Sequence, residues 1–131
     1  MAKLIYFTPT SLDGYIADET RQPLYWAAPD EGAFAFINDV TRPIGTYLYG
    51  RKMYQTVAVW ETPEVIPGRT PAMVDFARIW QAADKIVYSK SLETVATPKT
   101  RLEREFDAQA VRELKAQSPL DISVPGPTLA A

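Results

Sequence analysis

The chain has 131 residues, 47% of them hydrophobic, which is enough for one globular domain with a core of its own. Its formal net charge of −2 argues against a nucleic-acid partner, because proteins that bind nucleic acids favour a basic surface. The absence of cysteine and histidine excludes disulfides, thiolate or imidazole metal sites and histidine-based catalytic triads, so acid–base chemistry falls to Asp, Glu, Lys or Tyr.

The N-terminal segment predicts a strand and not a targeting signal. Residues 3–8 (KLIYFT) are rich in apolar and aromatic side chains, which favours a buried strand, and Asp13-Gly14 marks a turn. The segment has no small-residue cleavage site, and no apolar run in the chain approaches the ~20 residues that span a bilayer. We therefore expect a cytoplasmic protein with no membrane partner.

A helix is predicted from Asp30 onward, after a loop that carries Trp26. Asp30 can cap this helix, and Glu31 suits its first turn. Apolar residues then recur at the spacing of one helix face, which we expect to be buried; they are Ala33, Phe36, Ile37 and Val40.

The rest of the chain alternates between strand and helix patterns. In chain order it predicts a strand at 45–50, a helix at 51–60, a loop at 61–71, a helix at 72–83, a strand at 84–89, an edge strand or extended segment at 101–105, a helix at 106–117 and a strand at 120–124. This order predicts an α/β fold, in three layers, with a mostly parallel central sheet flanked by helices. No linker divides the chain, so residues 1–131 are expected to form a single domain. Tyr47 and Tyr49 alternate with Leu48, which favours packing within the sheet.

Three short stretches follow the ends of predicted strands, where α/β sheets bind their ligands. Each brings a glycine, a cation or a hydroxyl group to a position that suits a phosphate. Taken singly, each is more often an ordinary helix start, loop or proline-rich turn, but their common location favours one extended phosphate-bearing ligand. The residues are Gly50, Arg51 and Lys52; Ser89, Lys90 and Ser91; and Pro125 and Gly126.

A fourth stretch, residues 26–34, places two carboxylates among aromatic residues. Asp30 and Glu31 stand between Trp26 and Phe34, and a carboxyl group in such surroundings gains a raised pKa and can act as an acid. The alternative is an ordinary N-cap followed by a first-turn glutamate. Helical spacing favours Asp30 over Glu31 for the inward position.

Five segments, taken in order, resemble the dihydrofolate reductase-like family. They are KLIYFTPTSLDGYIAD, PDEGAFAFIND, GTYLYGRKMYQTV, DFARIWQAADKIVYSKSL and DISVPGP. The resemblance covers the chain from Lys3 onward, and SLDGYIA and YGRKMY are its most specific pieces. The most similar branch is the reductase domain of the bacterial bifunctional deaminase-reductases of riboflavin synthesis, together with its stand-alone relatives.

The resemblance implies that NADPH binds across the strand ends. Residues 50–52 would meet the cofactor phosphates, and residues 89–91 would meet the phosphate on the adenosine side. The turn at 125–126 would meet the pyrophosphate. A segment near the nicotinamide would contribute Asp13, Gly14 and Ile16.

The resemblance also implies where substrate binds. The helix that begins near Asp30 would line the substrate side, with Trp26 and Phe34 as substrate contacts and either Asp30 or Glu31 as the acid. The implied activity is that of an NADPH-dependent reductase, like 5-amino-6-(5-phosphoribosylamino)uracil reductase or dihydrofolate reductase. Such an enzyme transfers hydride to a pterin, a pyrimidine or a similar heterocycle.

The sequence departs from the family at its C-terminal end. Pro125-Gly126 stands where the family has Gly-Gly, and proline has no N–H to offer a phosphate. The family continues with a helix and further strands, so we expect this chain to be truncated relative to it and to leave a sheet edge open. The alternative to an enzyme is a non-catalytic remnant or a module that dimerises. The resemblance and the open edge both favour a homodimer.

Overall fold

A computed structural model describes residues 2–7, 31–65, 70–95, 97–125 and 129. The side chains of residues 34 and 65 lie outside this description. In chain order the elements are β1 (Leu4–Ile5), α1 (Glu31–Thr41), β2 (Ile44–Gly50), α2 (Arg51–Val57), the 3-10 turns η2 (Ala58–Glu61) and η3 (Pro63–Val65), α3 (Pro71–Ala82), β3 (Asp84–Tyr88), β4 (Thr100–Glu103), α4 (Ala108–Gln117) and β5 (Asp121–Ser123).

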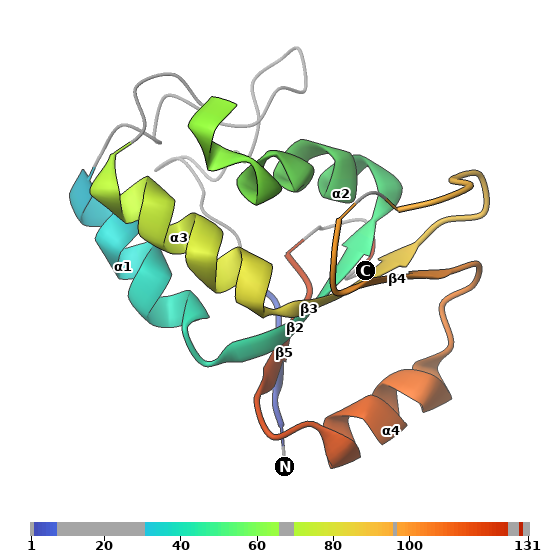
Figure 1. The fold of residues 1–131 in the computed structure, drawn as a ribbon. Helices are drawn as coiled ribbons and strands as arrows, with labels where there is room; N and C mark the ends of the chain where they lie inside the picture. The colour runs from blue at the N-terminus through green and yellow to red at the C-terminus, as the bar shows by residue number, and fades with distance from the viewer. Residues whose placement is uncertain (1, 8–30, 66–69, 96, 126–128, 130–131) are drawn as a thin grey trace, which may run out of the picture.

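The strands form one five-stranded sheet in the order β1-β5-β2-β3-β4, and every pair of neighbours is parallel. Parallel neighbours need crossover connections. Helices lie in the connections that lead to β2, β3 and β5, whereas the described part of the connection from β3 to β4 contains no helix. In Figure 1, α1, α2 and α3 lie on one side of the sheet and α4 on the other. This arrangement confirms the predicted three-layer α/β fold. No described helix is long and apolar enough to cross a membrane.

The central strand β2 supplies side chains to both faces of the sheet. Tyr47 and Tyr49 belong to the core cluster under α2 and α3, whereas Leu48 belongs to the cluster under α4. The two tyrosine rings stack in parallel with centroids 5.7 Å apart, and both residues are almost fully buried. The prediction that Tyr47 and Tyr49 pack within the sheet is therefore confirmed.

Helix α3 is well specified by its own sequence. Thr70 is its N-cap and accepts a hydrogen bond from the Met73 N–H at 3.3 Å, and Pro71 occupies the first turn. Trp80 is completely buried, and its Nε1 donates to the Tyr49 Oη at 3.0 Å. This bond satisfies two polar groups in the core and fixes α3 on β2.

Helix α1 buries a different face from the one predicted. Phe36 is 64% exposed and Ala33 is also exposed, so the expected apolar face was wrong at these two positions. The buried residues of α1 are Asn38 and Thr41. The spacing of apolar residues did not decide the orientation of this helix.

The reason lies in polar contacts between α1 and α3. The Asn38 Nδ2 donates to the Ala72 carbonyl oxygen at 2.9 Å, and the Arg42 Nη2 contacts the Asp75 Oδ2 at 2.6 Å. The first contact satisfies a buried amide, and the second is a hydrogen bond between charged groups; both stabilise the packing of the two helices. They hold the Asn38 side of α1 against α3, and Phe36 is left facing outward.

Some predicted boundaries also shift. Strand β1 is confined to Leu4–Ile5, because its parallel partner β5 is itself only three residues long. The helix predicted at 51–60 ends at Val57 and continues as the 3-10 turn η2. The segment at 101–105 does form an edge strand, β4, which pairs with β3.

Candidate functional site

The sheet gathers the three predicted strand-end stretches at one edge. Strands β5, β2 and β3 are adjacent and parallel, so their carboxyl ends lie side by side (Figure 1). Gly50 at the end of β2 pairs in register with Tyr88 at the end of β3. Ser89 follows directly after β3, and Pro125 follows two residues after β5. The sequence prediction that these stretches share a location is thus supported by the topology.

Two of the stretches are joined by a hydrogen bond. The Arg51 Nη1, from the start of α2, donates to the Ser91 Oγ at 2.9 Å. The Ser91 Oγ also lies 3.5 Å from the Ser89 Oγ. Arg51 and Ser91 are exposed, so the guanidinium and hydroxyl groups are open to a ligand.

Gly50 leaves room beside this pair. Its backbone is extended, with φ −79° and ψ 171°, a conformation that any residue adopts. Apart from its chain neighbours, a Cβ built on Gly50 would meet no described atom within 4 Å. Neither backbone conformation nor packing in the described structure requires a glycine here, whereas a ligand lying against the backbone would.

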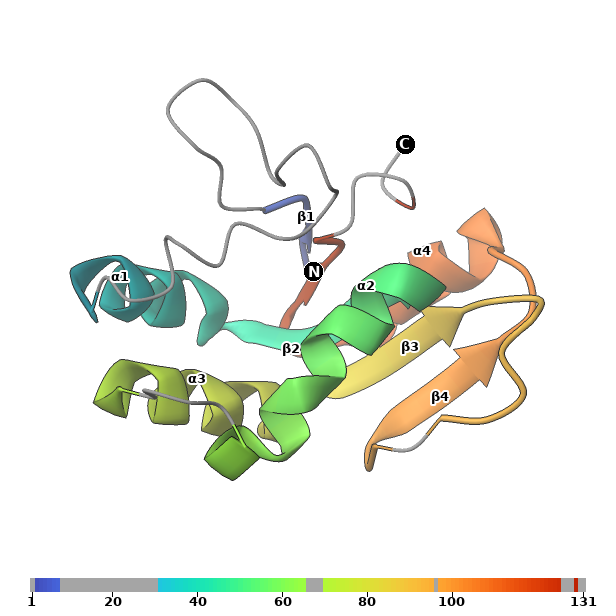
Figure 2. The ribbon, with the colours of Figure 1, turned by 90° about the horizontal axis from the view of Figure 1, so that it is seen from above.

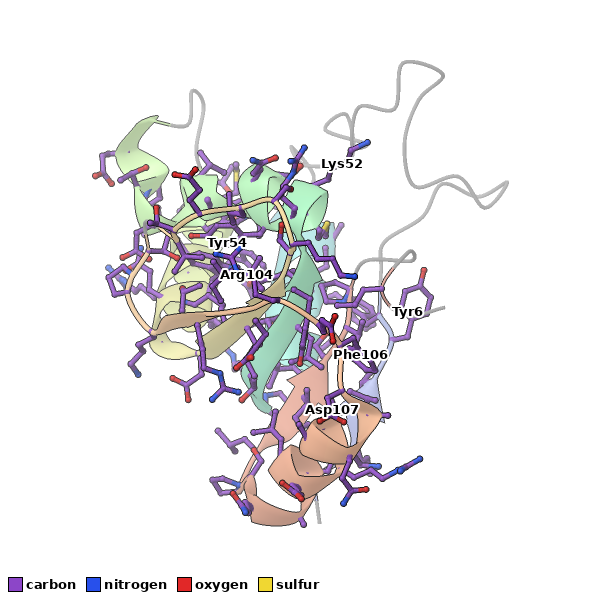
Figure 3. All side chains as sticks on the ribbon, turned by 90° about the vertical axis from the view of Figure 1, so that its right-hand side faces the viewer. Tyr6, Lys52, Tyr54, Arg104, Phe106 and Asp107 are labelled. Carbon is purple, nitrogen blue, oxygen red and sulfur yellow. The ribbon has the colours of Figure 1, made fainter. Side chains whose placement is uncertain are left out.

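The turn after β3 is held by Ser89, which was predicted as a site residue, and by Arg104, which was not. The Ser89 Oγ accepts a hydrogen bond from the Leu92 N–H at 3.0 Å, and Ser89 is buried. Arg104, which follows β4, donates from Nη1 to the carbonyl oxygens of Ser89, at 3.3 Å, and of Leu92 (Figure 3). Two carbonyl groups on one guanidinium hold the turn that presents Ser91 to Arg51.

The cations at this edge differ in how far they are neutralised. Arg51 and Lys52 are exposed, and neither forms an ion pair with a described carboxylate; Figure 3 shows Lys52 extending outward from α2. Lys90 lies 3.8 Å from Glu105, but both side chains are about four-fifths exposed, so this pair is weak. The edge therefore carries positive charge that suits an anionic ligand.

Of the two candidate acids, only Glu31 is described. Its Oε1 accepts a hydrogen bond from the Ala72 N–H at 3.0 Å, in the first turn of α3. Glu31 thus caps a neighbouring helix. Phe34 lies on α1, with its side chain outside the description, and the remaining predicted site residues lie wholly outside the described residues: Asp13, Gly14, Ile16, Trp26, Asp30 and Gly126.

A buried charged group lies beneath α3, away from the strand ends. The Lys85 side chain is almost fully buried, and its Nζ donates to the Trp80 carbonyl oxygen at 2.8 Å and sits 3.9 Å from the centroid of the Trp80 ring. Burial lowers the pKa of Lys85 to about 8, with the Glu61 carboxylate acting in the opposite direction. Burial likewise raises the pKa of Tyr47 to about 12. A lysine as the second residue of the otherwise mostly apolar strand DKIVY was the sequence signal for this group.

Other features of the described residues do not offer a better site. A hollow of about 440 Å³ lies at the opposite edge of the sheet, where β2 and β3 begin, and none of the predicted residues lines it. Parallel sheets bind ligands at the carboxyl ends of their strands, so we favour the edge that carries Arg51. The described residues contain no group of three or more carboxylates that could hold a metal ion.

No model of a known protein family and no curated protein sequence matches this chain. In fold, the chain is similar to the crystal structure of a "Putative riboflavin biosynthesis protein" from Shewanella sp. PV-4, with a TM-score of 0.61 and 18% sequence identity. The match covers 98% of this chain and 66% of that one, so this chain spans just under two thirds of that protein's length. At this identity the similarity shows the fold.

Proposed function

We propose that this protein is an NADPH-dependent reductase that acts on a pterin, a pyrimidine or a similar heterocycle. Bound NADPH would supply a hydride to a C=N or C=O group of the substrate. The fold similarity to a protein described in terms of riboflavin biosynthesis supports this proposal. The dihydrofolate reductase-like segments of the sequence support the same reaction class.

The observation that carries the proposal is the Arg51–Ser91 pair at the ends of β2 and β3. A guanidinium held by a neutral hydroxyl group keeps its positive charge and retains N–H groups for another acceptor. Arginine binds phosphate in a bidentate way, which suits the phosphates of a dinucleotide. The space beside Gly50 would let such a phosphate approach the backbone.

The end of β5 fits a phosphate less well. The Val124 N–H already donates to the Ile5 carbonyl oxygen at 2.8 Å, and Pro125 has no N–H. The described part of this turn therefore offers no free backbone donor. For this reason we assign the main phosphate contact to Arg51 and Ser91, with Lys52 and Ser89 beside them, and assign no phosphate contact to Pro125.

The proton for the reaction would come from the start of α1. Glu31 is engaged with the Ala72 N–H, which favours Asp30 as the acid that faces substrate. Burial of a carboxyl group among aromatic residues such as Trp26 and Phe34 would raise its pKa and let it donate at neutral pH. The protein itself would bind NADPH and the substrate, orient them and protonate the substrate.

The test is ligand binding followed by turnover. Thermal unfolding and cofactor fluorescence of the wild-type chain are measured with NADPH and with NADH, up to millimolar concentration. We expect a rise in melting temperature with NADPH, since a ligand that binds only the folded state stabilises it by mass action. The absence of any shift at millimolar NADPH would contradict the proposal for this chain.

A second candidate is a binding module of the same fold without catalytic activity. The observation that favours it is Pro125, which has no N–H to donate to a phosphate. This candidate predicts binding of NADPH without its oxidation when dihydrofolate or the phosphoribosylamino-uracil substrate is added. Oxidation of NADPH with either substrate would favour the reductase.

A further inference from the structure

Strand β4 is the outermost strand at its side of the described sheet. It pairs with β3 alone among the described strands, and Figure 2 shows it at the margin of the sheet. The coil between β3 and β4 lies toward α2, where the Thr97 Oγ1 and the Tyr54 Oη are 2.8 Å apart. The backbone N–H and C=O groups on the outer edge of β4 can therefore form hydrogen bonds with another strand.

The pairing with β3 determines which backbone groups of β4 face outward. The Lys85 N–H donates to the Lys99 carbonyl oxygen at 2.8 Å, and the Ser89 N–H donates to the Glu103 carbonyl oxygen at 2.9 Å. Backbone groups alternate in direction along a strand, so Lys99, Arg101 and Glu103 face β3. The N–H and C=O groups of Thr100 and Leu102 face away from the sheet.

The charges of β4 select one way for two copies of this edge to pair. An antiparallel pair must set outward-facing residues opposite one another, so Leu102 of one copy lies opposite Thr100, Leu102 or Arg104 of the other. If Leu102 lies opposite Thr100, Arg101 of one copy faces Arg101 of the other. If Leu102 lies opposite Arg104, Glu103 faces Glu103. Only the register centred on Leu102 sets Arg101 opposite Glu103, and it does so twice. Like charges directly opposite one another destabilise such a pair, whereas opposite charges stabilise it.

We propose that this chain forms a two-fold dimer in which β4 pairs antiparallel with β4 of a second copy, centred on Leu102. The edge is self-complementary, as a two-fold interface requires. The Leu102 residues of the two copies exchange N–H···O=C bonds across the axis, and Arg101 meets the partner's Glu103 on each side of it. The described strands of the two copies would then form one continuous sheet, in which neither β4 edge is exposed.

The side chains are arranged for this contact. Arg101 and Glu103 lie on one face of the strand and already form an ion pair within the chain, with Nε and Oε1 2.9 Å apart. Two such pairs across the axis give four charges of alternating sign. The Leu102 side chain is half-buried against the core under α2 and α3, so it anchors the strand at the centre of the contact.

Charge reversal tests this register without altering the fold elsewhere. Arg101→Glu and Glu103→Arg each place like charges across the axis, and we expect each to weaken dimerisation about tenfold or more. An equimolar mixture of the two variants restores both opposite-charge pairs, so it should form a heterodimer. The double variant, Arg101→Glu with Glu103→Arg, keeps every pair and should dimerise like wild type.

Sedimentation velocity from micromolar to millimolar protein measures the dimer, and circular dichroism checks that each variant folds. Hydrogen exchange adds a readout that needs no variant, because the Leu102 amide should be protected only at high protein concentration. A wild-type chain that stays monomeric at millimolar concentration overturns the proposal. So do single variants that dimerise as tightly as wild type, or a mixture of them that stays monomeric.

Discussion

Glu31 and Asp30 are adjacent in the sequence, and the structure describes only Glu31. The Glu31 carboxylate is held on the first turn of α3 by the Ala72 N–H, which makes it a bridge between α1 and α3. Asp30, one residue earlier, is the acid that we propose for proton transfer, because the Glu31 carboxylate is already engaged. A single-residue difference in sequence thus separates a structural carboxylate from the proposed catalytic one.

Conservative amide substitutions separate these two roles. Asp30→Asn should lower kcat about 100-fold or more, because it removes the proton donor, and should leave the melting temperature nearly unchanged. Glu31→Gln keeps an acceptor for the Ala72 N–H and should retain activity, with a loss of stability of about 1 kcal/mol or less. The measurements are NADPH oxidation and thermal unfolding for each variant. A loss of turnover in Glu31→Gln alone would reverse the assignment.

Lys85 makes stability depend on pH. Its pKa is about 8 in the folded chain against an ordinary value of 10.5. Between these values the unfolded chain binds more protons, so the free energy of unfolding should rise as pH increases from about 8 toward 10.5. The effect should be on the order of 1–3 kcal/mol.

The check compares wild type with Lys85→Met in denaturant unfolding at a series of pH values. The raised pKa values of Tyr47 and Tyr49 lower stability above pH 10 in both proteins. Their effect therefore cancels when the free energy of unfolding of the variant is subtracted from that of wild type, and the contribution of Lys85 remains. We expect the variant to be the more stable protein at neutral pH and to lose this advantage as pH rises. If the difference in the free energy of unfolding between the two proteins stays constant across the pH series, the pKa of Lys85 is not lowered in the folded chain.

At the scale of elements, β2 contains two glycines with different reasons for being there. A Cβ built on Gly45 would lie 2.7 Å from the Leu120 Cβ, in a region where the pairing of β2 with β5 is irregular. A Cβ on Gly50 would meet no described atom within 4 Å. Gly45 is needed for packing between β2 and the residues before β5, whereas Gly50 is free for a ligand.

Alanine substitution distinguishes these reasons. Gly45→Ala should destabilise the protein by about 1–3 kcal/mol through overpacking, and adding Leu120→Gly should recover part of this loss. Gly50→Ala should unfold at or above the wild-type temperature and weaken NADPH binding alone. Chemical denaturation and NADPH titration of each variant supply the answer. Equal stability of Gly45→Ala and wild type would disprove the packing role.

At the scale of the whole molecule, the alternation of strand and helix patterns predicted the fold, because parallel sheets require crossovers and leave few alternatives. The common location of Gly50 and Ser89 followed from the same rule. The orientation of α1 could not be predicted, since the Asn38–Ala72 and Arg42–Asp75 contacts join residues more than thirty positions apart. Arg104 was missed for the same reason, because its partners Ser89 and Leu92 belong to another turn.

The central claim is that the Arg51–Ser91 edge binds the phosphates of NADPH. Its most direct test is the dissociation constant of NADPH for wild type, Arg51→Ala and, as a matched control, Arg78→Ala, which removes an exposed arginine from α3. We predict that Arg51→Ala weakens binding by about 1–3 kcal/mol, the range for a charged hydrogen bond, and that Arg78→Ala binds like wild type. Equal affinity of Arg51→Ala and wild type would contradict the account.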